Sequence, residues 1–281
     1  MLSRRAILAA GYGAIVKAQD SGMFADARGY ERFMGRWSRA AAPLLVDFGR
    51  IPEQGQILDI GSGTGALALA MTELRPRCRV VGVDLSPEYV AFARSRARND
   101  RVRFEMADAQ NLPFAAGSFD AAASLLVFNF IPDPSKALAE ARRVTRPGGL
   151  VSAAVWDYGE GMRMLRLFWD AASALDSAAG RLDEKHMPLS RKRELYELWT
   201  RGGLGQVEEA PLEITMPFEN FDDFWNPFLL GQGPAGAYVK RLTAGRTAAL
   251  REELRHRAGD PSGAFTLPAR LWVVRGYVPT R

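Results

Sequence analysis

The stretch Ile57-Leu58-Asp59-Ile60-Gly61-Ser62-Gly63-Thr64-Gly65 decides the fold of this chain. It has the pattern of a short apolar strand that ends in a loop with glycine at every second position. Good helix formers follow from Ala66 to Met71. Glycine has no Cβ, so it can adopt positive φ and let a ligand touch the main chain. A helix start adds unpaired N–H groups and a partial positive charge, so the stretch predicts a site for a nucleotide-like ligand.

Strand and helix patterns alternate from Gln56 to Trp156. We expect strands at Gln56–Ile60, Arg79–Asp84, Val102–Met106, Asp120–Val127 and Leu150–Trp156. We expect helices at about Ala66–Leu74, Pro87–Arg98 and Ser135–Arg143, with Ser86 as a cap and Pro147-Gly148-Gly149 as the turn into the fifth strand. This alternation predicts a parallel sheet with helices on both faces, and ligands of such sheets bind at the carboxyl ends of the strands.

The alternation stops after Trp156, and other patterns follow. We expect helices over Met164–Leu175, around Leu195–Trp199 and over Tyr238–Arg257, and strands at Val207–Met216 and Leu271–Tyr277. The segment Phe218–Phe228 is dense in aromatic residues. The chain is therefore expected to form one domain over 23–281, with helical cap insertions at about 157–203 and 217–265.

Composition excludes several classes of protein. The 281 residues, 47% hydrophobic and 25% charged, suit a globular domain with its own core. A single cysteine, Cys78, excludes an intramolecular disulfide, and two histidines argue against a metal centre, so no metal is expected. The net charge of +5 is spread along the chain without an RNA-binding signature. We expect neither a nucleic-acid partner nor stable membrane insertion.

Three carboxylates fall at matching places along the predicted sheet. Asp59 ends the first strand, Asp84 ends the second, and Asp108 follows the third. Asp84 is placed to accept hydrogen bonds from two ribose hydroxyls, worth roughly 1.5–3 kcal/mol each. Asp108 with Ala109 can reach an adenine edge. A ligand ammonium group can approach Asp59 beside the glycine loop.

With these residues the chain resembles the class I S-adenosylmethionine-dependent methyltransferases, in the subgroup of quinone-biosynthesis C-methyltransferases and many small-molecule methyltransferases. The resemblance covers about residues 30–156. The matching segments are Leu58–Gly65, Val83-Asp84-Leu85-Ser86, Ala107-Asp108-Ala109, Leu112-Pro113-Phe114, Ser118-Phe119-Asp120, Arg143-Val144 and Arg146-Pro147-Gly148-Gly149. The resemblance implies an α/β fold, with a Rossmann-like, mostly parallel sheet of seven strands.

The resemblance also implies S-adenosyl-L-methionine as the cofactor and a role for each of several residues. The loop residues Gly61, Ser62, Gly63 and Gly65 would contact its methionine part. Asp84 would hold the ribose, Leu85 would pack on the adenine, and Asp108 and Ala109 would bind the adenine edge. Leu125 would lie near the methyl group. Tyr30 would belong to a segment that closes over the cofactor, and Arg36 would pair with the cofactor carboxylate. It identifies no catalytic base.

Other interpretations of the same residues stay open. The series Gly61-x-Gly63-x-x-Ala66 with Asp84 also fits a nicotinamide-dependent oxidoreductase. The additional matching segments favour S-adenosylmethionine over a nicotinamide cofactor. A cofactor-binding protein without transferase activity is a further alternative. Asp59 fits a structural role as well, binding loop amides, and Tyr30 and the Phe218–Phe228 segment fit a role in the core. The apolar caps suggest a small, partly hydrophobic methyl acceptor.

Residues 1–22 differ from the rest of the chain. Arg4-Arg5 precedes an apolar run from Ala6 to Val16, as in a short twin-arginine signal peptide. The run is too short to span a bilayer as a helix. The other interpretation is a start upstream of the true one, with Met23 opening the protein, or a loose N-terminal helix. We favour it, because S-adenosylmethionine is a cytoplasmic metabolite, and we expect a cytoplasmic protein.

Overall fold

The computed structural model describes residues 26–280, which form two compact units. The first unit holds residues 26–34, Asp157–Met187 and Glu213–Arg270, and the second holds Gly35–Trp156, Pro188–Leu212 and 271–280. The predicted N-terminal extension, 1–22, lies outside the described residues. Among the helices of residues 26–280, none combines the length and apolar character that a bilayer crossing requires.

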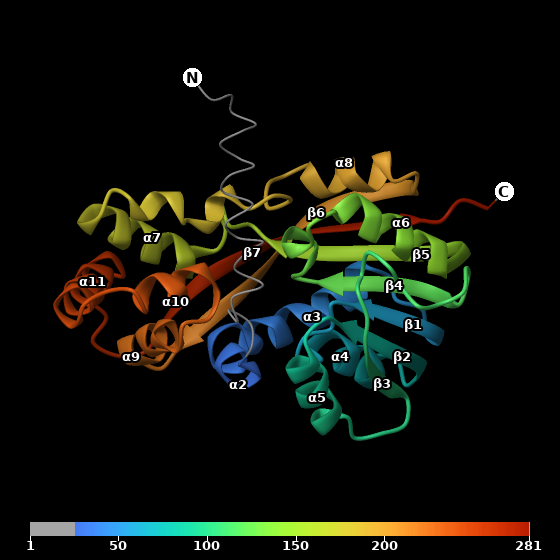
Figure 1. Cartoon of the computed structure of the whole chain (residues 1–281), viewed down its shortest axis with the longest axis horizontal. Coiled ribbons are helices and arrows are strands. Elements are labelled where there is room, and N and C mark those ends of the chain that lie inside the picture. Colours follow the sequence, from blue (N-terminus) through green and yellow to red (C-terminus); the bar gives the residue numbers. More distant parts are fainter. Residues whose placement is uncertain (1–25, 281) are drawn as a thin grey trace. The chain divides into compact units, whose positions relative to one another are not determined.

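The described residues contain a seven-stranded sheet in the order β3-β2-β1-β4-β5-β7-β6 (Figure 1). The strands are β1 (Gln54–Ile60), β2 (Arg77–Asp84), β3 (Val102–Met106), β4 (Phe119–Leu125), β5 (Thr145–Trp156), β6 (Gly205–Phe218) and β7 (Phe265–Tyr277). The first five pair in parallel, and β7 runs antiparallel to β5. The α/β fold class and the mostly parallel sheet of seven strands are therefore confirmed.

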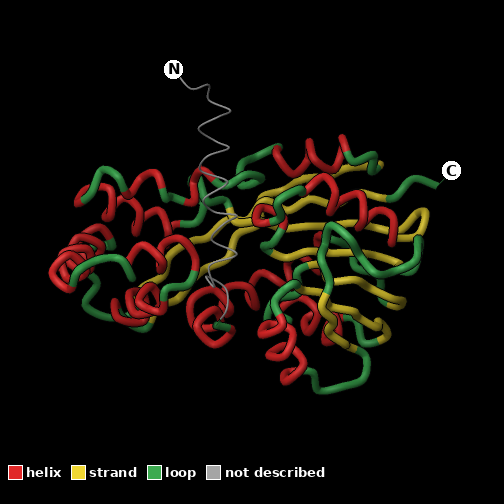
Figure 2. The backbone as a smooth tube through the Cα atoms, viewed as in Figure 1, coloured by secondary structure: helices red, strands yellow, loops and turns green. Residues whose placement is uncertain are grey.

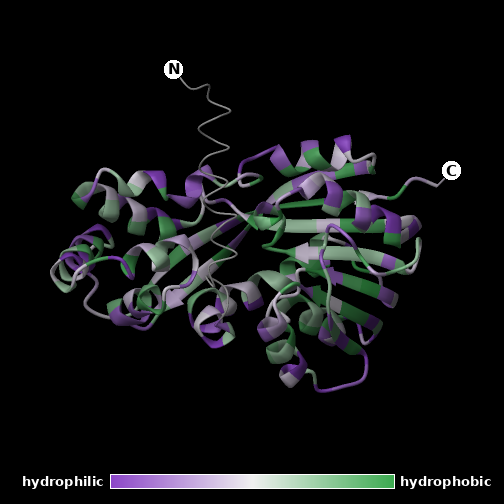
Figure 3. Ribbon diagram, in the orientation of Figure 1, coloured by the Kyte–Doolittle hydropathy of each residue, from purple (hydrophilic) through white to green (hydrophobic). Residues whose placement is uncertain are grey.

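Helices of the second unit cover both faces of its strands (Figure 2). On one face, α6 (Pro134–Val144) and α8 (Glu194–Arg201) share a buried apolar cluster with alternate residues of the strands. On the other face, α3 (Arg36–Phe48) and α4 (Ala66–Leu74) pack together and against the strands. Strand β4, most of β5 and the second halves of β1 and β2 are mostly hydrophobic (Figure 3) and buried, as expected for strands that are covered on both faces.

The local signals place several elements correctly. Helix α4 has the predicted bounds, and α5 (Pro87–Arg96) begins at the predicted cap, where Ser86 Oγ accepts a hydrogen bond from Tyr89 N. Helix α3 was not predicted. Its buried residues Trp37, Ala41 and Leu45 recur every four positions, and Pro43 interrupts its sequence.

Several predicted boundaries differ from the structure. Strand β5 begins at Thr145 and β7 at Phe265, before the predicted starts, so Pro147-Gly148-Gly149 lies within β5 and is not the turn that leads into it. Strand β4 ends at Leu125, two residues early, because Leu126 takes a left-handed conformation with φ of 65° and leads into the turn η2 (Phe128–Phe130). The helix predicted over Tyr238–Arg257 is two helices, α10 (Gly233–Val239) and α11 (Ala244–Arg257). The second begins where the Thr243 side chain accepts a hydrogen bond from Arg246 N, because a cap of this kind starts a new helix.

The first unit has an aromatic core of its own. Its helices are α2 (Ala27–Tyr30), α7 (Arg163–Leu175), η3 (Ala179–Arg181), η4 (Glu184–His186), α9 (Phe221–Trp225), η5 (Asn226–Leu230), α10 and α11, and η1 (Glu31–Gly35) continues α2 into α3. The rings of Phe168 and Phe228 stack with centroids 4.6 Å apart, and those of Phe218 and Phe265 with centroids 5.2 Å apart. The aromatic residues of Phe218–Phe228 are buried, so their interpretation as core is confirmed.

Arg166, Asp183 and Glu184 are buried charged side chains of this unit. Arg166 Nη1 donates to Asp183 Oδ2 over 2.8 Å, which holds the segment before η4 against α7. Beside this pair, Glu184 is 3% exposed and accepts a hydrogen bond from the Trp169 indole. Burial raises the pKa of Glu184 to about 7, and the nearby Asp183 charge adds to the shift. Glu184 is therefore partly protonated near neutral pH.

Candidate functional site

The glycine loop joins β1 to α4 at the carboxyl edge of the parallel strands. Gly61, Gly63 and Gly65 have φ of 69°, 52° and 90°, a region that L side chains rarely adopt. Ser62 N donates to Val83 O over 2.8 Å, so the loop is attached to the end of β2 as well as β1. The sequence therefore folds here into the strand, loop and helix start that its glycine spacing predicts.

The three glycines are needed for different reasons. A Cβ at Gly61 would lie 2.5 Å from Val127 Cγ1, and one at Gly65 would lie 3.0 Å from Phe104 Cζ. A Cβ at Gly63 would have no neighbour nearer than Tyr89, at 3.9 Å. Internal packing therefore explains Gly61 and Gly65. A Cβ at Gly63 would make only an ordinary contact, so packing does not explain this glycine, and its bare main chain suits the close approach of a ligand.

Asp84 holds this loop in place. Its Oδ2 accepts a hydrogen bond from Gly63 N at 2.8 Å, and its Oδ1 accepts one from Ser86 N at 2.9 Å. Burial raises the pKa of Asp84, while these backbone donors partly offset the rise. Nothing in the sequence predicts this contact with Gly63. The predicted contact of Asp84 with a ribose remains a prediction, and it would use the same carboxylate that sets the conformation of the loop.

Asp59 is fully buried at the end of β1. Its Oδ2 accepts a hydrogen bond from Ala68 N at 2.9 Å, which is the structural role that the sequence left open. Its Oδ1, like Ser62 Oγ, has no hydrogen-bond partner among the described residues. Burial raises the pKa of Asp59 to about 8, and the charge of Asp84 adds to this. A ligand with a cationic group would supply the missing partner and favour the ionised carboxylate, so these residues fit the ammonium end of S-adenosylmethionine.

Two large apolar side chains are exposed at the neighbouring strand ends. Leu85 follows β2 and is 63% exposed, and Met106 ends β3 and is 55% exposed. Met106 pairs with Asp84 across the two strands, so both side chains belong to the same edge. Apolar surface of this kind suits the face of an aromatic ring. Leu85 was predicted from the sequence. Met106 was not, because nothing in the sequence distinguishes it from an ordinary strand residue.

The remaining predicted residues lie at different places. Ala107 N donates to Asp84 O over 3.1 Å, which brings the segment with Asp108 and Ala109 beside the end of β2. Asp108 Oδ1 accepts a hydrogen bond from Gln110 N at 2.8 Å and so stabilises its own turn. Leu125 is buried as the last residue of β4. The adenine and methyl contacts assigned to these residues remain predictions.

The residues predicted to close over the cofactor belong to the segment before β1. Arg36 opens α3, and its guanidinium lies 4.1 Å from the centre of the Trp37 ring. Tyr30 ends α2 in the first unit. The roles of Tyr30 and Arg36 toward a cofactor remain predictions.

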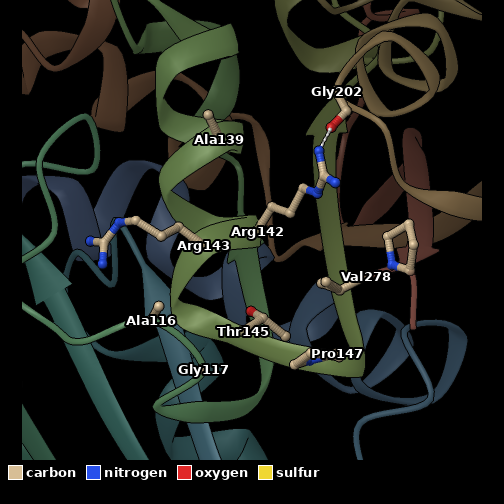
Figure 4. A pocket seen from close by; sticks show the side chains of 10 residues that line it. Ala116, Gly117, Ala139, Arg142, Arg143, Thr145, Pro147, Gly202 and Val278 are labelled. Atoms are coloured by element: carbon tan, nitrogen blue, oxygen red, sulfur yellow. Dashed lines mark hydrogen bonds between the residues drawn. The ribbon is translucent and has the colours of Figure 1, made fainter. Parts of the chain in front are cut away.

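The second unit also has a pocket of about 540 Å³ at the opposite edge of the parallel strands (Figure 4). It is lined by residues at the start of β4 and β5, among them Gly117 and Thr145. Arg142 at its wall donates a hydrogen bond to Gly202 O over 3.1 Å. Because ligands of such sheets bind at the carboxyl ends of the strands, this pocket is separate from the candidate cofactor site.

Comparisons with known proteins agree with this geometry. Residues 58–153 match the family model described as a methyltransferase domain. The chain is 44% identical to a demethylmenaquinone methyltransferase of Thermus thermophilus over 116 residues, 41% of this chain and 51% of the relative. It is 31% identical to a malonyl-[acyl-carrier protein] O-methyltransferase of Geobacter sulfurreducens over 227 residues, 80% of this chain and 83% of the relative. The chain thus spans about half the length of the demethylmenaquinone methyltransferase.

Solved structures share the fold. Phosphoethanolamine N-methyltransferase 2 of Haemonchus contortus, solved with S-adenosylhomocysteine, superposes with a TM-score of 0.57 at 19% identity. The match covers 92% of this chain and 58% of that one. These comparisons confirm the predicted Rossmann-like fold, and S-adenosylmethionine as the cofactor of the family. The chain belongs to the class I S-adenosylmethionine-dependent methyltransferases.

Proposed function

We propose that this protein transfers the methyl group of S-adenosylmethionine to a small, partly hydrophobic acceptor. The observation that carries the proposal is the bare main chain of Gly63 beside the buried, half-partnered carboxylate of Asp59. A polar, cationic ligand that touches the backbone satisfies both features. The relatives support methyl transfer, and their names specify different acceptors, demethylmenaquinone and malonyl-[acyl-carrier protein].

In this proposal the chain binds and orients the cofactor. Asp59 faces its ammonium group, Asp84 accepts from its ribose, and Leu85 with Met106 packs against its adenine. When bound, the sulfonium supplies an activated methyl group, which the acceptor takes as the carbon–sulfur bond breaks and a proton is released. Holding the reacting atoms in line can supply roughly 7–11 kcal/mol of the barrier, so a dedicated base is not required by the chemistry. Because this cofactor is a cytoplasmic metabolite, we also propose a cytoplasmic location.

Calorimetry with the purified protein tests the cofactor. S-adenosylmethionine should bind, and NAD and NADP should not. Tight binding of a nicotinamide cofactor in its place would favour the oxidoreductase. Incubation of metabolite extracts with a radiolabelled methyl donor then tests transfer, and binding without any labelled product would favour a cofactor-binding protein that lacks transferase activity.

A further inference from the structure

Asn129 carries a buried side-chain amide. It lies in the turn η2, its side chain is 1% exposed, and neither its Nδ2 nor its Oδ1 has a partner among residues 26–280. Leaving a buried polar group unpaired costs about 1–3 kcal/mol, and native proteins retain few such groups. We therefore expect a partner for this amide that is not part of the described chain.

The position of η2 relates Asn129 to the glycine loop. Ser124 Oγ donates to Ile60 O over 2.8 Å, which joins the end of β4 to the end of β1. Val127, two residues before Asn129, packs over Gly61. The segment that carries Asn129 therefore lies beside the glycine loop, at the same edge of the sheet.

The surrounding residues fix this turn. Leu126 adopts φ of 65°, a conformation that a residue other than glycine rarely takes, and its N–H donates to Ala154 O over 2.8 Å. Phe128, the first residue of η2, and Ile131, which follows η2, are members of the buried apolar cluster, and Asn129 is not. The Phe128 ring packs against Trp199 with centroids 5.0 Å apart. The turn is thus held by its apolar neighbours, and the amide contributes no contact that explains its burial.

We propose that Asn129 binds the methyl acceptor through a two-point hydrogen bond, an inference that rests on the proposed function. A primary amide offers a donor and an acceptor in one plane and carries no charge. The matching partner is a neutral, planar group in which an N–H or O–H donor lies beside a carbonyl oxygen. The N–H or O–H of this partner donates to Asn129 Oδ1, and its carbonyl oxygen accepts from Asn129 Nδ2. We therefore infer that the methyl acceptor is a neutral ring that carries both groups side by side.

The test uses the nearly isosteric variant Asn129→Leu and two probes. The first probe, 2-quinolone, has an N–H beside a carbonyl, and the second, 1-methyl-2-quinolone, has the same ring with the donor blocked. Binding of each is measured by calorimetry with S-adenosylhomocysteine present. The wild type should bind 2-quinolone at least tenfold more tightly than its methylated form, and Asn129→Leu should remove this preference while changing cofactor affinity less than twofold.

Thermal unfolding separates a binding role from a structural one. Without ligands, Asn129→Leu should have an unchanged or higher Tm, because it removes an unpaired buried polar group. Ser152→Ala is the matched control, because Ser152 Oγ in the middle of β5 is also buried without a partner among the described residues. Ser152→Ala should also have an unchanged or higher Tm, and it should still bind 2-quinolone more tightly than 1-methyl-2-quinolone.

Three results would overturn the proposal. They are a lower Tm of Asn129→Leu with the probe preference intact, equal binding of the two probes by the wild type, and binding of neither. A wild type that fails to bind S-adenosylhomocysteine contradicts the proposed function itself, and the two failures are therefore distinguishable.

Discussion

Gly63 gives the sharpest test of the cofactor site, through the substitution Gly63→Ala. The new Cβ would meet no atom of the protein within 3.9 Å, so the folded protein has room for it. The φ of 52° still disfavours any residue with a Cβ, by roughly 1–2 kcal/mol. We therefore expect a folded variant with a modest loss of stability.

The free energy of cofactor binding should be lost in addition to this loss of stability, because the substitution also changes the surface that the ligand contacts. A methyl group on the face that the ligand touches moves the ligand away from the backbone N–H groups of the loop. Losing one hydrogen bond to a charged group costs about 1.5–3 kcal/mol, which corresponds to at least a tenfold weaker Kd. Calorimetry with S-adenosylmethionine measures the Kd, and thermal unfolding measures the stability of the same sample.

Gly117→Ala is the matched control for backbone strain. Gly117 has φ of 70°, and a Cβ there would make only ordinary contacts, the nearest with Arg146 Cα at 3.7 Å. It precedes β4 at the opposite edge of the parallel strands, so its substitution should cost similar stability and leave the Kd unchanged. If Gly63→Ala bound the cofactor as tightly as Gly117→Ala does, the ligand would not approach this backbone and the site would be misassigned.

Three further predictions follow from the buried carboxylates. Asp84→Ala should weaken S-adenosylmethionine binding at least tenfold in calorimetry, because it removes the acceptor for the ribose and for Gly63 N; unchanged affinity in a folded variant would contradict the ribose role. Burial raises the folded-state pKa of Asp59 from 3.8 to about 8, so the unfolding free energy should fall as pH rises between these values. Asp59→Asn should be more stable than the wild type above pH ~8 yet bind the cofactor more weakly, and pH-dependent denaturation with calorimetry checks both. The folded-state pKa of Glu184, raised from 4.5 to about 7, predicts a similar fall over that range, on the order of 3 kcal/mol at most; Glu184→Gln should flatten the profile in urea titrations at pH 4 to 8, and an identical slope in the variant would refute the assignment.

The early end of β4 and the break between α10 and α11 were missed for different reasons. The apolar run through Val127 continues the strand pattern, and no residue in it marks a break, yet Leu126 turns out of β4. A left-handed leucine is costly by itself and persists only because the surrounding packing holds it, so local sequence does not predict it. The break between α10 and α11 did carry a local signal, the cap at Thr243.

The sequence alone determined the α/β fold, the position of the glycine loop and the family. These follow from local rules, because a strand, a glycine-rich turn and a helix start each depend on residues that are neighbours in the chain. The tertiary structure decided which glycines internal packing requires and that Asp84 holds Gly63. It also buries Asp59 and Asn129 with polar atoms that have no hydrogen-bond partner among residues 26–280. Those properties depend on residues far apart in sequence, such as Val127 over Gly61 and Phe104 against Gly65, and only packing brings them together.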